Sequence, residues 1–149
     1  MILMYEHILV PLDGSENSRK ALDVAIKLAK TFSSKLSLLS IVDNRNFAMP
    51  ATAAAAPNSS YSELTSYAHD IVDDGLKTVK ENGLDAETIV TQGYPKSVIA
   101  TDVPKKNNID LIVIGKSGRG AIDRFIIGST TAYVVRNATV QVLVVNDDA

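Results

Sequence analysis

The sequence has 149 residues, with 15 Lys or Arg, 17 Asp or Glu, two His and no Cys. This length predicts one domain over residues 1–149. The absence of Cys excludes thiol catalysis, disulfide scaffolds and cysteine-ligated metal sites, and it fits a cytoplasmic protein. The formal net charge of −2 gives no electrostatic reason to bind nucleic acid or an anionic membrane. No apolar run approaches the ~18 residues of a membrane span.

Five short apolar runs, each bounded by turn residues, predict β-strands. They are rich in Leu, Ile and Val, as are strands that are buried on both faces of a parallel sheet. The runs span residues 7–12, 36–42, 87–91, 110–115 and 140–145.

Between these runs, apolar residues recur with the 3.6-residue period of an amphipathic helix. The longer helical patterns span residues 18–30, 61–82 and 129–137. Ser15 or Asn17 can cap the first helix, and Gly83 is placed to end the second. A shorter helix starts near Pro95. Pro104 should end or kink it, because proline cannot donate the required backbone hydrogen bond.

The alternation of strands and helices predicts an α/β fold: a single doubly wound, mainly parallel five-stranded sheet, Rossmann-like, with helices on both faces. In such folds a ligand binds beyond the carboxyl ends of the strands, where the winding reverses. Residues 43–60 interrupt the alternation, since Pro50, Pro57 and the alanines between them follow neither pattern. The sequence leaves open whether this flexible loop is only a surface loop or is a lid or partner-docking segment.

The densest chemical signal follows the fourth predicted strand. It reads Gly115-Lys116-Ser117-Gly118-Arg119-Gly120, and Gly128-Ser129-Thr130 opens the last helix. Glycines let backbone approach a ligand closely, and free N–H groups at a helix N-terminus suit an anion. The spacing matches neither G-x-x-x-x-G-K-[ST] nor the dinucleotide motif G-x-G-x-x-G. The alternative is that these glycines form turns and Ser129 only caps the helix.

The spacing G-x2-G-x9-G-[ST] resembles the ATP-binding signature of the universal stress protein family. The residues that match it are Gly115, Gly118, Gly128 and Ser129. The resemblance covers nearly the whole chain, including the opening strand and turn at 7–15 and the Gly93-Tyr94-Pro95 start of the third helix. It implies the strand order 3-2-1-4-5, in which the first and fourth strands are neighbours. Asp13 then faces the glycine signature across the crevice.

By this resemblance, the chain binds an adenine nucleotide, either ATP or else ADP or AMP, with Mg²⁺ or Mn²⁺ accompanying the phosphates. Asp13 contacts the adenosine, flanked by Pro11 and Leu12, and Ile41 or Val42 lines the adenine. The positions around the ribose and phosphates are Gly115, Ser117, Gly118, Arg119, Gly128, Ser129 and Thr130. The alternative for Asp13 is a turn residue in Asp-Gly-Ser.

The resemblance also implies a stress-response regulatory protein that acts as a nucleotide-dependent switch. Two alternatives stay open: a slow ATPase or phosphotransferase, for which no clear general base appears, and a nucleotide-free dimeric interaction module. The apolar closing strand, from Val140 to Val145, is expected at a sheet edge, where the resemblance implies antiparallel pairing into a homodimer. The sequence identifies no protein partner.

Overall fold

One five-stranded sheet organises the chain. The computed structural model describes residues 4–43, 57–117 and 126–146, without the side chains of 57–60. The strands are β1 (His7–Pro11), β2 (Lys35–Asp43), β3 (Glu87–Gly93), β4 (Leu111–Gly115) and β5 (Gln141–Val145). They lie in the order β3-β2-β1-β4-β5, and every pairing is parallel. The predicted doubly wound fold and strand order are confirmed, and the strand bounds differ from the prediction by one or two residues.

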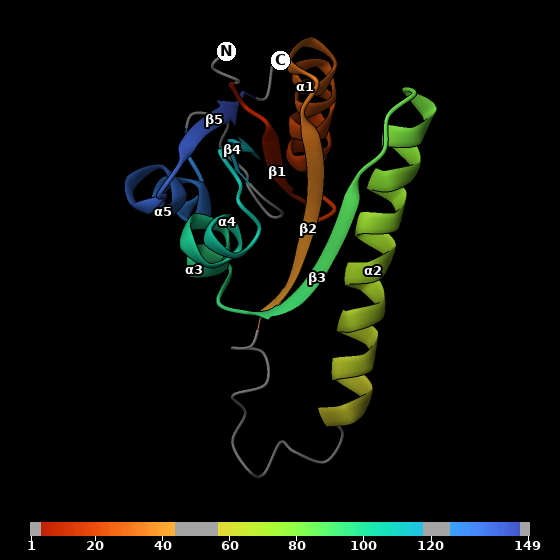
Figure 1. Ribbon diagram of the computed structural model, residues 1–149. Helices are drawn as coiled ribbons and strands as arrows, with labels where there is room; N and C mark the ends of the chain where they lie inside the picture. Colours follow the sequence, from red (N-terminus) through yellow and green to blue (C-terminus); the bar gives the residue numbers. More distant parts are fainter. Residues whose placement is uncertain (1–3, 44–56, 118–125, 147–149) are drawn as a thin grey trace.

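Helices cover both faces of this sheet (Figure 1). One face is covered by α1 (Glu16–Phe32) and α2 (Pro57–Glu81). The other face is covered by a helical stretch and by a last helix; these elements are α3 (Pro95–Ser97), η3 (Val98–Asp102), α4 (Val103–Lys106) and α5 (Ser129–Asn137). The central strand β1 is therefore buried on both sides, with Ile8, Leu9 and Val10 fully buried. Ile8 and Val10 pack toward α1 and α2, whereas Leu9 packs toward the opposite layer.

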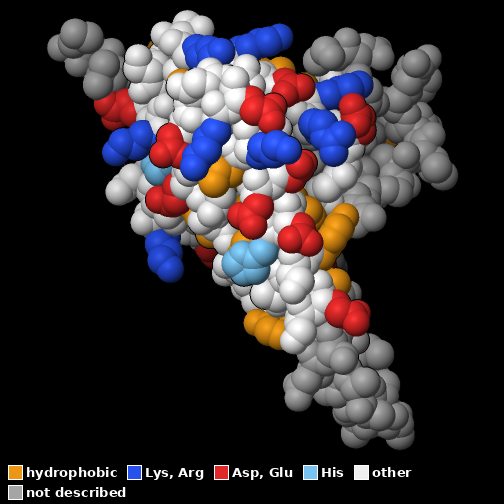
Figure 2. Space-filling view, turned by 90° about the vertical axis from the view of Figure 1, so that its right-hand side faces the viewer, with side chains coloured by type: hydrophobic (Ala, Val, Ile, Leu, Met, Phe, Trp, Pro, Cys, Tyr) orange, Lys and Arg blue, Asp and Glu red, His pale blue; other side chains and the backbone are white. Residues whose placement is uncertain are grey.

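The surface formed by the α1–α2 layer mixes charges of both signs. Figure 2 looks onto this side and shows Lys and Arg side chains interspersed with Asp and Glu over the upper part of the molecule. Such alternation differs from the continuous basic stripe that tracks a phosphate backbone. None of the helices in the described ranges is long and apolar enough to cross a membrane.

Local capping sets the start of α1. The Ser15 hydroxyl accepts a hydrogen bond of 3.1 Å from the N–H of Ser18, which makes Ser15, one of the two predicted candidates, the N-cap. At the other end, Ser33 has a left-handed conformation with φ +56°, and its N–H donates to the Ala29 carbonyl. The helix extends two residues beyond its predicted bounds at each end. Its first and last turns carry polar residues, so the apolar periodicity that predicts the helix is absent there.

The helix α2 begins earlier than its predicted first residue at position 61 and shortens the predicted loop. Its first residue is Pro57, which tolerates the first helical position because that N–H has no partner inside a helix. Asp43, in turn, belongs to β2. The loop prediction for 43–60 is therefore wrong at both ends, and its remaining part, 44–56, lies outside the described residues.

Gly83 ends α2 as the sequence predicts. It has φ +80°, and its N–H donates to the Lys80 carbonyl while the N–H of Leu84 donates to the Val79 carbonyl. This pair of bonds is the Schellman arrangement, which satisfies carbonyls that would otherwise lack a partner. Leu84 also packs against the core cluster that contains Val79.

Pro104 does not end the third helical stretch. The helix continues to Lys106 and instead widens to a π-helix over Val98–Asp102, immediately before α4. Because Pro104 has no N–H, it cannot donate to the carbonyl of Ala100, four residues earlier. The N–H of Thr139 donates to that carbonyl at 3.3 Å. A partner from the segment before β5 thus replaces the missing bond, which sequence pattern alone does not anticipate.

Replacing Gly83 with Ala should destabilise the protein by about 1 kcal/mol, because a Cβ is disfavoured at positive φ. A Cβ at this position would meet no atom within 4 Å, so steric contact adds nothing to the cost. Gly83→Asn, which tolerates this conformation better, is the matched control and should lose less. Urea unfolding checks both variants, and equal stability of Gly83→Ala and the natural protein would contradict the proposed cap.

Candidate functional site

A cleft of about 660 Å³ lies at the carboxyl ends of β1, β2 and β4, where the winding of the sheet reverses. Its floor comes from the strand ends, and its walls come from three segments that follow other strands: α2, the Pro95 turn and the start of α5. This is the place at which doubly wound sheets bind their ligands.

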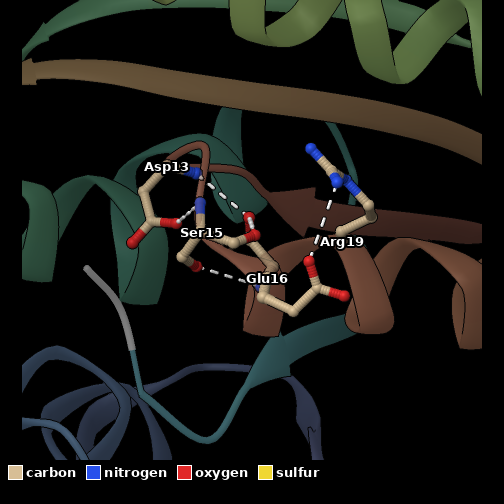
Figure 3. Close-up of polar contacts among 5 residues, drawn as sticks. Asp13, Ser15, Glu16 and Arg19 are labelled. Carbon is tan, nitrogen blue, oxygen red and sulfur yellow. Dashed lines mark hydrogen bonds and ion pairs between the residues drawn. The ribbon is translucent and has the colours of Figure 1, made fainter. Parts of the chain in front are cut away.

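The turn after β1 places Asp13 in this cleft (Figure 3). Its carboxylate accepts a hydrogen bond of 2.9 Å from the N–H of Ser15, and Gly14 adopts φ +83° between them. The hydroxyl of Ser18 donates to the Ser15 carbonyl at 2.9 Å. An exposed ion pair of 3.7 Å between Glu16 and Arg19 adds little. The turn hydrogen bonds therefore hold the Asp13 carboxylate in position along the cleft.

Two glycines shape the opposite side, where β4 ends. A Cβ on Gly115 would lie 2.8 Å from the carbonyl oxygen of Asn17, so the end of β4 and the start of α1 approach each other as closely as backbones allow. Asn17 also donates a 2.7 Å hydrogen bond from Nδ2 to the Ser117 hydroxyl. The N–H of Gly128 donates to the Lys116 carbonyl at 3.0 Å, which brings the start of α5 back to the end of β4.

The hydroxyls at the start of α5 make this side of the cleft polar. Ser129 and Thr130 line the cleft, and buried Thr131 donates its hydroxyl proton to the Gly115 carbonyl at 2.8 Å. The N–H groups of the first turn have no partner inside the helix. They sit at the positive end of the helix dipole, so this wall offers hydrogen-bond donors to an anion.

The side next to β2 is largely apolar, although Ser40, Asp43 and Tyr67 also line it. It is formed by strand residues Ile41 and Val42 and, on the facing elements, by the residues Leu64, Ala68, Ile71, Pro95 and Ile99. The cleft thus has an apolar end at β2, Asp13 in the middle and a hydroxyl-lined end at β4 and α5. This arrangement matches an elongated ligand with a flat apolar group at one end and an anionic group at the other.

Most of the predicted site residues meet in this cleft. Those that line it are Pro11, Leu12, Asp13, Ile41, Val42, Gly115, Ser117, Ser129 and Thr130. Gly128 stands beside the wall and is tied to Lys116. Gly118 and Arg119 lie outside the described residues, so their predicted contacts stay predictions.

Sequence reasoning missed the α2 wall and two buried hydroxyls. Leu64, Ala68 and Ile71 fit the helical pattern, but nothing in that pattern places their end of α2 over the carboxyl end of β2. Ser40 was read only as part of an apolar strand, and Thr131 directly follows the predicted Ser129–Thr130 pair. Alternation along β2 could have singled out Ser40, because it interrupts a run of buried apolar residues.

Neither histidine belongs to the cleft lining. His7 lies at the first residue of β1, at the opposite edge of the sheet, where its Nε2 is 2.6 Å from the Ser37 hydroxyl. His69 is an exposed residue of α2. In the described ranges no group of three or more His, Asp or Glu residues is arranged to hold a metal ion by itself.

The comparisons with known proteins now identify the family. The model of the universal stress protein family matches residues 4–146. The chain belongs to this family. A protein of Staphylococcus aureus (strain USA300) that carries the family name is 32% identical over 149 residues, which cover 99% of this chain and 87% of that protein.

Solved universal stress proteins share this chain's fold. UspA from Lactobacillus plantarum has a TM-score of 0.84 at 28% identity, covering 95% of this chain and 98% of that one. A universal stress protein solved in complex with cAMP has a TM-score of 0.66 at 25% identity, covering 95% and 97% of the two chains.

Replacing Gly115 with Ala should cost about 2 kcal/mol of stability, because the added methyl group meets the Asn17 backbone, which cannot turn aside as a side chain can. The matched control is Gly93→Ala, whose Cβ would meet only a methyl group of Val98 at 2.8 Å. Urea unfolding should show the larger loss for Gly115→Ala. Equal losses in both variants would mean that the contact between β4 and α1 is not tightly packed.

Proposed function

We propose that this universal stress protein binds an adenine nucleotide in the cleft and acts as a nucleotide-dependent switch. The observation that carries the proposal is the division of one cleft into an apolar end, a central carboxylate and a hydroxyl-lined helix start. Adenine fits between apolar side chains, a ribose presents hydroxyl donors to a carboxylate, and phosphates accept hydrogen bonds from N–H and O–H groups.

In the proposed binding mode the nucleotide extends along the cleft, with its base at β2 and its phosphates at α5. Ile41 and Val42 contact the adenine, Asp13 accepts hydrogen bonds from the ribose, and Ser129 and Thr130 donate to phosphate oxygens. The bound cAMP of a structural neighbour supports an adenine nucleotide as the ligand class. The volume of about 660 Å³ lies in the range of small-molecule sites and admits a triphosphate as well as a monophosphate.

The resemblance to the family's ATP-binding signature favours ATP among these nucleotides, because its described members Gly115, Gly128 and Ser129 lie at the proposed phosphate end. A divalent cation would enter with the phosphates. Mg²⁺ commonly binds through substrate phosphates and retained waters rather than through an all-protein cage. Ser129 and Thr130 are the described cleft residues whose hydroxyls could add to such a shell.

The same cleft offers a route from binding to regulation. Its walls come from α2 on one side and from the Pro95 turn and α5, which pack against each other, on the other side. The sheet joins these two sides. A nucleotide that bridges them favours the arrangement in which all walls contact it, and it shifts the population toward that state. The surfaces of α2 and α5 are the parts of the molecule that a partner would then meet in altered positions.

Substituting Asp13 with Asn should weaken AMP and ATP binding about fivefold to tenfold, because a charge-assisted hydrogen bond to the ribose becomes a neutral one. The amide oxygen still accepts from the N–H of Ser15, so the turn is kept. The matched control is Asp85→Asn, whose carboxylate only accepts from the neighbouring Ala86 N–H and lies outside the cleft. Isothermal titration calorimetry gives the affinities.

Failure of the natural protein to bind any adenine nucleotide in this titration would refute the proposed function. Unchanged affinity in Asp13→Asn would refute only the role of Asp13. A turnover assay on the same samples separates a switch from an enzyme: the switch requires binding without fast phosphate release, well below the enzyme median of about 10 s⁻¹.

We also propose that two copies pair through β5. This strand pairs with β4 on one side, and within the described residues no other strand pairs with its outer edge. Leu143 on this strand is 38% exposed, which is a large exposed fraction for an apolar edge residue. An exposed apolar edge strand is a template for pairing with another chain.

Light scattering should give a mass of twice the 16.0 kDa chain at micromolar concentration. Leu143→Lys should shift the protein toward monomer, because an antiparallel two-fold pairing brings the two introduced charges near each other. Thr88→Lys, an exposed position on the opposite edge strand β3, is the matched control and should leave the mass unchanged. A monomeric natural protein would contradict the dimer.

A further inference from the structure

One buried serine of the cleft has a hydroxyl without a hydrogen-bond partner among the described residues. The buried polar side chains of the described core are Ser18, Ser37, Ser40, Ser117 and Thr131. Four of them are hydrogen bonded within the protein: Ser18 to Ser15, Ser37 to His7, Ser117 to Asn17 and Thr131 to Gly115. The exception is Ser40, which is 3% exposed. Its hydroxyl has no hydrogen bond to any group in the part of the chain that the structure describes.

Such an exception calls for a partner from outside the protein. Buried polar groups in folded proteins are almost always hydrogen bonded, and leaving a hydroxyl unpaired is costly. Ser40 lines the cleft, so a ligand or a water molecule in the cleft can reach it. The buried side-chain oxygen without a partner in the described ranges is Oγ1 of Thr65, which belongs to a residue outside the cleft lining.

The position of Ser40 selects which part of a ligand it meets. Ser40 follows Leu38 by two residues on β2, so both side chains point to the α1–α2 face. Leu38 lies under Gly75 of α2: a Cβ on Gly75 would be 3.2 Å from it. Because α2 runs opposite to the strands, its earlier residues Ala68 and Ile71 lie over the end of β2. Ser40 is thus a buried serine at the β2 end of the cleft, where Asp43 and Tyr67 are the other polar residues beside the apolar side chains.

We propose that the Ser40 hydroxyl accepts a hydrogen bond from the 6-amino group of the adenine base and thereby determines base recognition. This inference rests on the proposed function. With the ribose at Asp13 after β1, the base extends toward β2, and the 6-amino group is on the edge of adenine that lies farthest from the ribose. It donates hydrogen bonds, and the hydroxyl oxygen of Ser40 supplies an acceptor among apolar side chains.

The test compares two ligands and three proteins by calorimetry. The ligands are AMP and purine riboside 5′-monophosphate, which differs from AMP only by lacking the 6-amino group. We expect Ser40→Ala to bind AMP about fivefold more weakly than the natural protein, in line with the loss of one neutral hydrogen bond. The analogue should bind both proteins alike. Ser37→Ala, a buried serine on the same strand but outside the cleft, is the matched control and should bind AMP normally.

Unfolding of the ligand-free variants gives an independent measurement. Ser40→Ala should keep its stability, because no protein hydrogen bond is lost, whereas Ser37→Ala should lose stability together with its bond to His7. A clear loss in Ser40→Ala would show that the hydroxyl has a partner inside the protein and would overturn the proposal.

Three binding results would also overturn it. Normal AMP affinity in Ser40→Ala would mean that the Ser40 hydroxyl forms its hydrogen bond with water and not with the nucleotide. An equal loss for AMP and the analogue would place the contact on another part of the nucleotide. Equal affinity of the natural protein for AMP and the analogue would show that the 6-amino group is not recognised. This measurement needs no variant. If the natural protein binds no adenine nucleotide, the proposed function fails first, and this inference fails with it.

Discussion

The cleft depends on the close approach between the end of β4 and the start of α1. These two segments are far apart in the sequence, but the order of the sheet makes β1 and β4 neighbours, and α1 begins directly after the turn that follows β1. Gly115 allows the Asn17 backbone to come within the distance that a Cβ would occupy. A larger residue would push α1 away from β4 and would change the spacing between Asp13 and the hydroxyls of α5.

Hydrogen bonds from the protein itself hold this region in place. Asn17 binds Ser117, Thr131 binds the Gly115 carbonyl, and the Asp13 carboxylate accepts from the Ser15 N–H. Each bond uses a polar group at the border of the cleft, so a ligand meets groups whose orientation is already restricted. Preorganisation of this kind reduces the ordering cost of binding. The two roles considered for Asp13, a turn residue and a ligand contact, are compatible. The same carboxylate accepts from the Ser15 N–H and lines the cleft.

The apolar end of the cleft is built differently. Here the wall is the N-terminal half of α2, which lies over the end of β2 and lines the cleft with apolar residues such as Ala68 and Ile71. Nonpolar packing is non-directional, so this wall can adjust to a ligand more readily than the hydrogen-bonded side at β4. In this arrangement Ser40 supplies the directional contact that an apolar pocket lacks, and the hydroxyls at α5 supply the contacts for an anion.

Local sequence patterns were enough to predict the parallel sheet, the order of its helices and the motif residues at the carboxyl edge of the sheet. Runs such as Ile8–Leu9–Val10 and the spacing around Gly115 and Gly128 are local signals, because burial on both faces and glycine turns leave a periodic or fixed-spacing trace. The end of α2 at Gly83 was predictable in the same way, because a glycine directly after a helical pattern is a local signal.

Which groups from distant parts of the chain meet is visible only in the folded structure. The Ala100 carbonyl in the π-helix before Pro104 accepts from the Thr139 N–H, which comes from another part of the chain. The α2 wall and the position of the Ser40 hydroxyl beneath it likewise depend on how a helix lies over a strand end. Sequence patterns report a residue's own environment, buried or exposed, whereas a missing or replaced hydrogen-bond partner is a property of pairs of groups. Such pairs exist only once the chain has folded.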